Sequence, residues 1–201
     1  MAANEALRFH LHNEWEQLQK EVELLQSAID LIEIGHPDSA KGNHNLSTII
    51  LMGTASAIEK SYSGMERILK IVAENIDDYV PRGDAWHKSL VDQMAADLDS
   101  RSHIIEPITA QGLHVLRAFR HRERNSYSLD LDKTRVLALG KQVFSVVENL
   151  KTDMLTLLDI SLSNHSEDSD SLQKLPFNQD GYFDQQISGK QSANGDNTEI
   201  I

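Results

Sequence analysis

Apolar residues recur at helical spacing in five stretches of the chain, and the first stretch is the clearest. From Leu7 to Ile32 they follow one another at steps of three or four residues, which places them on one narrow stripe of an amphipathic helix. The stripe consists of Leu7, Leu11, Trp15, Leu18, Val22, Leu25, Ile29 and Ile32. We expect this helix to end near residues 35–37 (GHP), because proline disfavours helical geometry in the residue before it.

The next two stretches predict a long helix and a short one. The long helix should begin with Ser47 as its N-cap and continue toward Tyr79, with a bend where residues 61–64 (SYSG) weaken it. The short helix should begin after Asp84, which is a suitable N-cap. The expected core positions are Ile50, Ala57, Met65, Ile68, Leu69, Val72 and Ile76 in the long helix, and Trp86, Leu90, Val91, Met94 and Leu98 in the short one.

The last two stretches complete the predicted fold. Pro107 suits the first turn of a fourth helix that reaches about Tyr127, and Asp130 or Asp132 should cap a fifth helix that ends near residue 160. Five helices with short connections predict an all-α fold, an antiparallel bundle. The expected core positions are Ile108, Leu113, Leu116 and Phe119 in the fourth helix, and Val136, Leu139, Val143, Val147, Leu150, Met154, Leu157 and Leu158 in the fifth.

Composition divides the 201-residue chain into two parts. Its 40% hydrophobic content is that of one globular domain, which the predicted helices place at residues 1–163. Residues 164–201 are rich in Ser, Asp, Gln, Asn and Gly, and they contain seven acidic residues against two lysines. We therefore expect these residues to form a disordered acidic tail.

Composition also excludes some kinds of site and location. The chain contains no cysteine, which excludes disulfides, thiolate-zinc sites and cysteine nucleophiles. No stretch approaches the roughly 20 apolar residues of a membrane span, and the N-terminus lacks the apolar core of a signal peptide. We therefore expect a soluble, cytoplasmic protein that does not insert into a membrane.

The charge distribution points to one segment of the fourth helix. A net charge of −12 argues against nucleic-acid binding, which depends on Lys and Arg, but residues 114–124 contain four arginines against Glu123 alone. Residues three, four and seven apart share a helix face, which gives two adjoining polar stripes. One stripe consists of Arg117, Arg120, Arg124 and Tyr127, and the other of His114, His121 and Asn125. Such a surface can bind RNA phosphates, and the alternative is a solvated face with weak ion pairs.

Three segments of the chain resemble a known family. The segments are 57-AIEKSYSGMERILKIVAENID-77, 84-DAWHKSLVDQMA-95 and 117-RAFRHRERNSYSLDLD-132, and the resemblance extends over nearly all of residues 5–160. They are similar to the HepT-like family, the toxin half of bacterial toxin-antitoxin pairs and a branch of the HEPN nucleases. The resemblance implies a helical bundle that forms a homodimer, with Arg and His of both protomers in a metal-independent ribonuclease site. It also implies a neighbouring tyrosine that a nucleotidyltransferase antitoxin adenylylates.

The family pattern matches this chain at two of its three site positions. The arginine corresponds to Arg120 and the tyrosine to Tyr127, but the histidine position contains Asn125. Attack by an RNA 2′-hydroxyl needs a group that moves protons near neutral pH, which an imidazole does and an asparagine amide does not. His121, one helical turn before Asn125, is the candidate that could replace it.

Three functions stay open from the sequence. The first is a ribonuclease toxin that cleaves RNA with Arg120, His121 and Asn125 at its site and with Arg117 and Arg124 bound to phosphates, without metal or cofactor. The second is an inactive family member that binds RNA or regulates. The third is an interaction module that presents Tyr127 to a nucleotidyltransferase. Whether the chain is an enzyme depends on the change at position 125.

Two charged segments of the second helix have a simpler interpretation. Glu66-Arg67 and Asp77-Asp78 are expected to face solvent, and Trp86 is expected to pack in the core.

Overall fold

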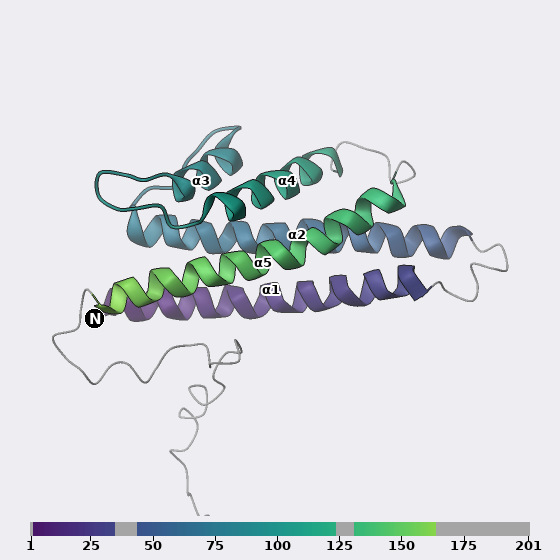
Figure 1. The fold of residues 1–201 in the computed structure, drawn as a ribbon, viewed down its shortest axis with the longest axis horizontal. Coiled ribbons are helices and arrows are strands. Elements are labelled where there is room, and N and C mark those ends of the chain that lie inside the picture. Colours follow the sequence, from purple (N-terminus) through teal and green to yellow (C-terminus); the bar gives the residue numbers. More distant parts are fainter. Residues whose placement is uncertain (1, 35–43, 124–130, 164–201) are drawn as a thin grey trace, which may run out of the picture.

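The computed structural model describes residues 2–34, 44–123 and 131–163, and these residues form a bundle of α-helices (Figure 1). The only β-type pairing among them is one isolated bridge between Leu98 and Arg101. The fold is therefore all-α, as the sequence predicts. The helices are α1 (Ala2–Ile34), α2 (His44–Ile76), α3 (Trp86–Ala95), α4 (Pro107–Glu123) and α5 (Lys133–Ser163). The predicted acidic tail, residues 164–201, lies outside the described residues.

Helix α2 is the centre of the bundle, since it contacts each of the other four helices. The three long helices α1, α2 and α5 run side by side, and the shorter α3 and α4 pack on α2 on the side away from α1 (Figure 1). Helix α4 also contacts α5. Side chains of α2 that face α3 and α4 therefore lie beneath the two short helices.

The core is formed by the apolar stripes that the sequence predicts. On α1, six of the eight predicted positions are buried, and Val22 and Ile32 are half-buried at its edge. The largest fully buried side chains come from four of the helices and the segment before α4. They are Leu18, Leu25 and Ile29 of α1, Ile58, Tyr62, Met65, Ile68 and Leu69 of α2, Leu90 and Met94 of α3, Ile105, and Leu113 of α4.

Three predicted core residues are exposed instead. Ile76 lies at the last residue of α2, where the packing against its neighbours ends. Leu98 lies beyond α3, in the bridge to Arg101. Ile108, in the first turn of α4, is 61% exposed on the outer face of that helix.

The expected bend in α2 is wrong, because the helix is continuous through residues 61–64. Gly64 is buried against α1, and a Cβ at this position would lie 3.1 Å from Leu18 Cδ1. The glycine therefore permits close contact between two helices rather than a bend. Helix α2 also begins at His44, three residues before the predicted N-cap Ser47.

Two of the four predicted helix starts are correct, those at Pro107 and Asp132. Pro107 is the first residue of α4. The Asp132 carboxylate accepts hydrogen bonds from the backbone N–H groups of Thr134 at 2.9 Å and Arg135 at 3.4 Å, so it caps α5. The N-cap of α3 is Ala85 rather than Asp84, and it makes no side-chain cap. There, the N–H of Trp86 bonds to the carbonyl of Gly83 at 3.2 Å, and this turn takes the place of a side-chain cap.

A buried ion pair ties the end of α2 to the segment between α3 and α4. Arg101 donates from Nε and Nη2 to the two carboxylate oxygens of Asp77, each at 2.6 Å. Burial by itself raises the pKa of Asp77, but hydrogen bonds from Arg101 and Gln93 and the charge of Arg101 outweigh it and hold the pKa below its ordinary value. The expectation that Asp77 faces solvent is therefore wrong.

No helix among the described residues is long and apolar enough to cross a membrane.

Candidate functional site

Five residues from three helices form a polar cluster at the arginine that the sequence singles out. We call it the Arg120 cluster, and it consists of Glu59, Tyr62 and Glu66 of α2, His87 of α3 and Arg120 of α4. The α2 residues are spaced three and seven apart, so they share the helix face that lies beneath α3 and α4. The cluster is therefore built on regular helices, which hold its side chains in fixed relative positions.

The guanidinium of Arg120 lies between two carboxylates. Its Nη1 donates to Glu66 Oε2 at 3.1 Å, its Nε lies 3.5 Å from Glu59 Oε1, and its central carbon lies 5.7 Å from the centre of the Tyr62 ring. The side chain is only 15% exposed. Arg120 is thus not a surface arginine of a solvated helix face. It is held in one orientation by three side chains of α2.

Glu66 joins the other members of the cluster. Its Oε1 accepts a hydrogen bond from the Tyr62 hydroxyl at 3.1 Å and is paired with His87 Nδ1, while its Oε2 accepts from Arg120. The side chain is 8% exposed, so the expectation that Glu66 faces solvent is wrong. The sequence pattern failed here because a charge on a long helix is usually solvated unless another element covers it, and α3 and α4 cover this one.

The electrostatics of the cluster keep the Tyr62 phenol protonated. Burial raises its pKa most, followed by the negative charge of Glu66 and the hydrogen bond to that carboxylate, and the charges of Arg120 and Arg117 only partly oppose this. The hydroxyl therefore acts as a hydrogen-bond donor to Glu66. It cannot serve as a base at physiological pH.

The His87 ring is held from two sides. Glu66 pairs with Nδ1, and the Trp86 ring stacks on the imidazole with ring centres 3.7 Å apart and planes 30° from parallel. Trp86 itself is half-buried and packs against the edge of the hydrophobic core. The sequence predicts that it packs in the core. The His87 side chain remains 28% exposed, which leaves part of the ring open to solvent.

The two described arginines of α4 have donors to spare. The Nε atoms of Arg117 and Arg120 are buried, and no hydrogen-bond partner for either lies among the described residues. A guanidinium has five N–H donors, and Arg120 makes one hydrogen bond, to Glu66, within the described structure. Because the Arg120 side chain is 15% exposed, a further acceptor such as an anionic oxygen would have to approach its terminal Nη atoms rather than the buried Nε.

The other predicted site residues lie at or beyond the limit of the described structure. The backbone of His121 belongs to α4, but its side chain is outside the described residues. Arg124, Asn125 and Tyr127 fall in residues 124–130, which are also outside them. Arg117 and Arg120 are the predicted site residues that the structure places near one another, beside Tyr62.

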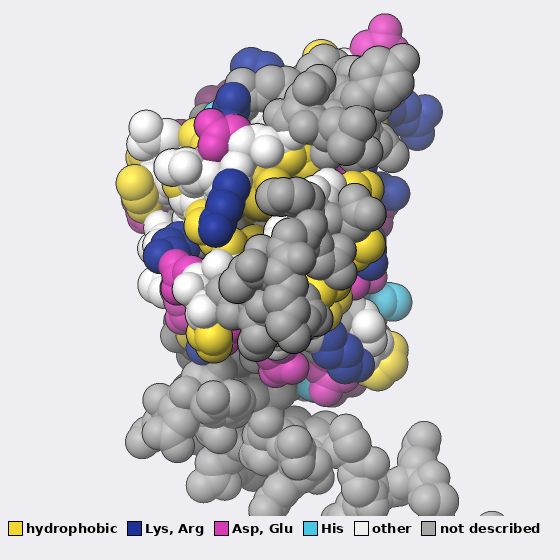
Figure 2. All heavy atoms as spheres, turned by 90° about the vertical axis from the view of Figure 1, so that its right-hand side faces the viewer, with side chains coloured by type: hydrophobic (Ala, Val, Ile, Leu, Met, Phe, Trp, Pro, Cys, Tyr) yellow, Lys and Arg dark blue, Asp and Glu magenta, His cyan; other side chains and the backbone are white. Residues whose placement is uncertain are grey.

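Charges of both signs are mixed on the described surface near one end of the bundle. In Figure 2 the coloured Lys and Arg side chains alternate with Asp and Glu, and they do not form one basic face. This agrees with the net charge of −12. RNA that binds to this part of the surface would therefore depend on individual Lys and Arg side chains rather than on a broad positive field.

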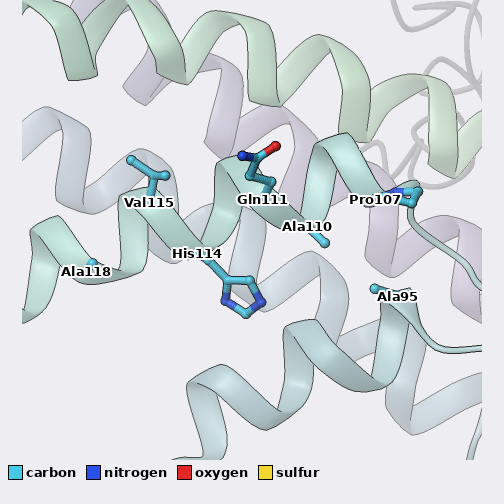
Figure 3. Close-up of a pocket in the computed structure, with 7 residues that line it drawn as sticks. All are labelled: Ala95, Pro107, Ala110, Gln111, His114, Val115 and Ala118. Carbon is cyan, nitrogen blue, oxygen red and sulfur yellow. The ribbon is translucent and has the colours of Figure 1, made fainter.

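A shallow groove of about 570 Å³ lies between α3 and α4. Figure 3 shows the His114 ring pointing from α4 toward the helix that ends at Ala95, and His114 Nε2 pairs with Asp92 at 3.0 Å. Apolar groups provide most of the lining, which consists of Ala95, Pro107, Ala110, Gln111, His114, Val115 and Ala118. The groove does not include the Arg120 cluster, and it lacks the convergent polar groups of a catalytic pocket.

Within residues 2–34, 44–123 and 131–163, no three His, Asp or Glu side chains are grouped so that they could hold a metal ion.

Four members of the cluster are not among the site residues that the sequence predicts, namely Glu59, Tyr62, Glu66 and His87. The spacing of the three α2 residues was visible in the sequence as one polar face on a helix that is otherwise apolar on that side. Nothing in the spacing of His87 indicates its pairing with Glu66, because that contact depends on how α3 packs on α2.

Comparison with protein families places the chain in a described family. The family model described as HepT-like protein matches residues 53–160, which include all three segments from which the resemblance was inferred. Comparisons with curated proteins and with solved structures found no match. The family match begins in α2 and ends in α5, so it contains every residue of the Arg120 cluster. Since it spans more than half of the 201 residues, the chain belongs to the HepT-like protein family.

Proposed function

We propose that this toxin-family protein is a metal-independent endoribonuclease of the cytoplasm that acts as a homodimer, with its site at the Arg120 cluster. The observation on which the proposal rests is the Arg120 guanidinium, which two carboxylates and an aromatic ring hold in one orientation. Burying an arginine between carboxylates contributes little to stability in itself. A preoriented guanidinium is what stabilisation of a developing phosphorane charge requires.

The sequence offers a rival function within the same family. Asn125 stands where the family pattern has its histidine, which favours an inactive member that binds RNA or regulates. Restoring the histidine with Asn125→His separates the two possibilities. A chain that is inert as wild type and cleaves RNA after this change is an inactive member, whereas a wild type that already cleaves is an enzyme.

A nucleotidyltransferase antitoxin is the proposed partner, with Tyr127 as the residue that it adenylylates. The motivating feature is the tyrosine at the matching position of the family pattern. We expect a nucleotidyltransferase gene beside the gene of this chain. Co-expression with its product, followed by mass spectrometry, should show one added AMP, and Tyr127→Phe should remove it. An unmodified Tyr127 would refute this part of the proposal.

The ribonuclease proposal is tested with RNA and purified protein in EDTA. We expect cleavage by the wild type and a loss of roughly 100-fold or more in Arg120→Ala, the magnitude typical of an electrostatic group at a transition state. Arg67→Ala is the matched control, because Arg67 is an arginine of α2 that pairs with Glu14 of α1 and is half exposed. No cleavage by the wild type would refute the proposal.

A further inference from the structure

One carboxylate of the Arg120 cluster positions two chemically different groups. Glu66 accepts from Arg120 Nη1 on Oε2 at 3.1 Å and pairs with His87 Nδ1 on Oε1. The guanidinium and the imidazole therefore flank a single, nearly buried carboxylate. A cation that binds phosphate and a group that moves protons are the two components that RNA cleavage by a 2′-hydroxyl needs.

The pairing also determines which ring nitrogen is available. A carboxylate accepts hydrogen bonds, so Nδ1 of His87 carries the hydrogen, and in the neutral ring Nε2 has the free lone pair. Nε2 has no hydrogen-bond partner within the described part of the chain, and the ring is partly exposed. The stack on Trp86 restricts rotation of the ring. This is the arrangement of a histidine base that a carboxylate orients.

We propose that His87 is the proton-transfer residue of this protein and that Glu66 is its positioning residue, which holds the imidazole beside Arg120. The proposal rests on the ribonuclease function proposed above, and it replaces His121 in that role. It also explains how the chain can keep its activity with Asn125 at the family's histidine position.

The charged groups around His87 suit this role. Glu66 pairs with His87 from α2, and Arg120 of α4 pairs with the other oxygen of this carboxylate. Glu59 contacts Arg120, and the charge of Arg117 acts on Tyr62. The Tyr62 hydroxyl is a donor to Glu66 and does not compete as a base. His87 therefore provides the imidazole of the Arg120 cluster.

The proposed step needs no further reactant. Nε2 of His87 takes the proton of the 2′-hydroxyl while that oxygen forms a bond to phosphorus, and Arg120 donates to the phosphoryl oxygens. The bond from phosphorus to the 5′-oxygen then breaks, and this oxygen takes the proton back from the imidazolium. The products are a 2′,3′-cyclic phosphate and a 5′-hydroxyl end.

The test uses the full chain and a short RNA in EDTA, with His87→Asn and His87→Gln as variants. The Asn amide can still donate to Glu66 in place of Nδ1–H, so the packing is kept while the titrating nitrogen is lost. We expect kcat to fall by roughly 100-fold or more in both variants. The wild-type rate should rise with pH through the range in which imidazoles lose a proton, and the residual rate of the variants should lack this rise.

His103→Gln is the matched control. His103 also pairs through Nδ1 with a carboxylate, that of Asp97 at 2.9 Å, but it lies before the start of α4, about 20 Å along that helix from Arg120. Its rate and pH profile should equal those of the wild type. For Glu66→Gln we expect a smaller loss in kcat together with a changed pH profile.

The experiment distinguishes a failure of the proposed role of His87 from a failure of the proposed ribonuclease function. Wild-type cleavage that persists at full rate and with an unchanged pH profile in His87→Asn and His87→Gln, but is lost in His121→Ala, overturns the role of His87 and leaves the ribonuclease function standing. A wild type that cleaves no RNA refutes the ribonuclease function itself.

Discussion

At the scale of single residues, the position of a charged side chain depends on what covers it. Glu66 and Arg67 are neighbours in the sequence and both were expected to face solvent, yet Glu66 is buried beneath α3 and α4 while Arg67 is half exposed against α1. Breaking the two ion pairs should therefore lower the free energy of unfolding by different amounts. A buried charge that is left without its partner destabilises the protein far more than an exposed one.

Glu66→Ala should destabilise the protein by about 3 kcal/mol, because it leaves the nearly buried Arg120 guanidinium with one carboxylate, Glu59, in place of two. Arg67→Ala removes a surface pair and should cost less than about 1 kcal/mol. Urea unfolding of the two variants and the wild type measures both. Equal losses would show that the cluster contributes no more than a surface ion pair.

Asp77→Asn should change how stability depends on pH. The pKa of Asp77 is lowered in the folded state. The stabilisation that its carboxylate contributes is therefore complete above pH 3.8, the ordinary pKa of an Asp, and is lost as pH falls through the folded pKa. At pH 7 the variant should be less stable than the wild type by about 3 kcal/mol, and the difference should shrink as the pH falls toward about 2. Urea midpoints over this range test it, and a difference that stays constant would contradict it.

At the scale of elements, the sequence predicts helices well and their packing poorly. The five helices, the start of α4 at Pro107 and the cap of α5 at Asp132 follow from local signals. The continuity of α2 through Gly64 does not follow from local signals, because this glycine permits a close contact with α1, and the sequence near Gly64 does not indicate that contact. The Arg120 cluster could not be predicted in full for the same reason, since α3 provides His87 and only packing brings it to Glu66.

Two helical glycines should respond in opposite ways to the same change. A Cβ on Gly112 would lie 2.4 Å from Val146 Cγ2. Valine in a helix strongly prefers one rotamer, so the Val146 side chain cannot turn away without cost. Gly112→Ala should therefore destabilise the protein by about 1–3 kcal/mol. Nothing lies within 4 Å of a Cβ on Gly53, so Gly53→Ala should stabilise by about 0.5–1 kcal/mol. Thermal unfolding checks both signs, and a stabilising Gly112→Ala would contradict the close approach of α4 to α5.

At the scale of the whole molecule, we propose a homodimer in which a second copy binds to α4. Ile108 and Val115 are exposed large apolar residues on this helix, and Val115 also lines the groove beside α3. The same helix contains Arg120, so a second copy bound here would approach the proposed site. Exposed apolar side chains that adjoin a groove are common at such interfaces.

Light scattering should give a mass of twice the 22.6 kDa of one chain. Ile108→Glu combined with Val115→Glu should give the monomer mass, because each change would bury a charge in the interface. Phe9→Glu is the control, since Phe9 is as exposed as Ile108, at 62%, but belongs to α1. A wild-type protein of monomer mass would refute the proposed dimer.

The most direct test of the account is the rate at which the wild type and Arg120→Ala cleave RNA in EDTA, with folding of both verified by circular dichroism. We predict cleavage by the wild type that leaves 2′,3′-cyclic phosphate ends, and a rate lower by roughly 100-fold or more in the variant. Equal rates in the two proteins, or no cleavage by either, would contradict it.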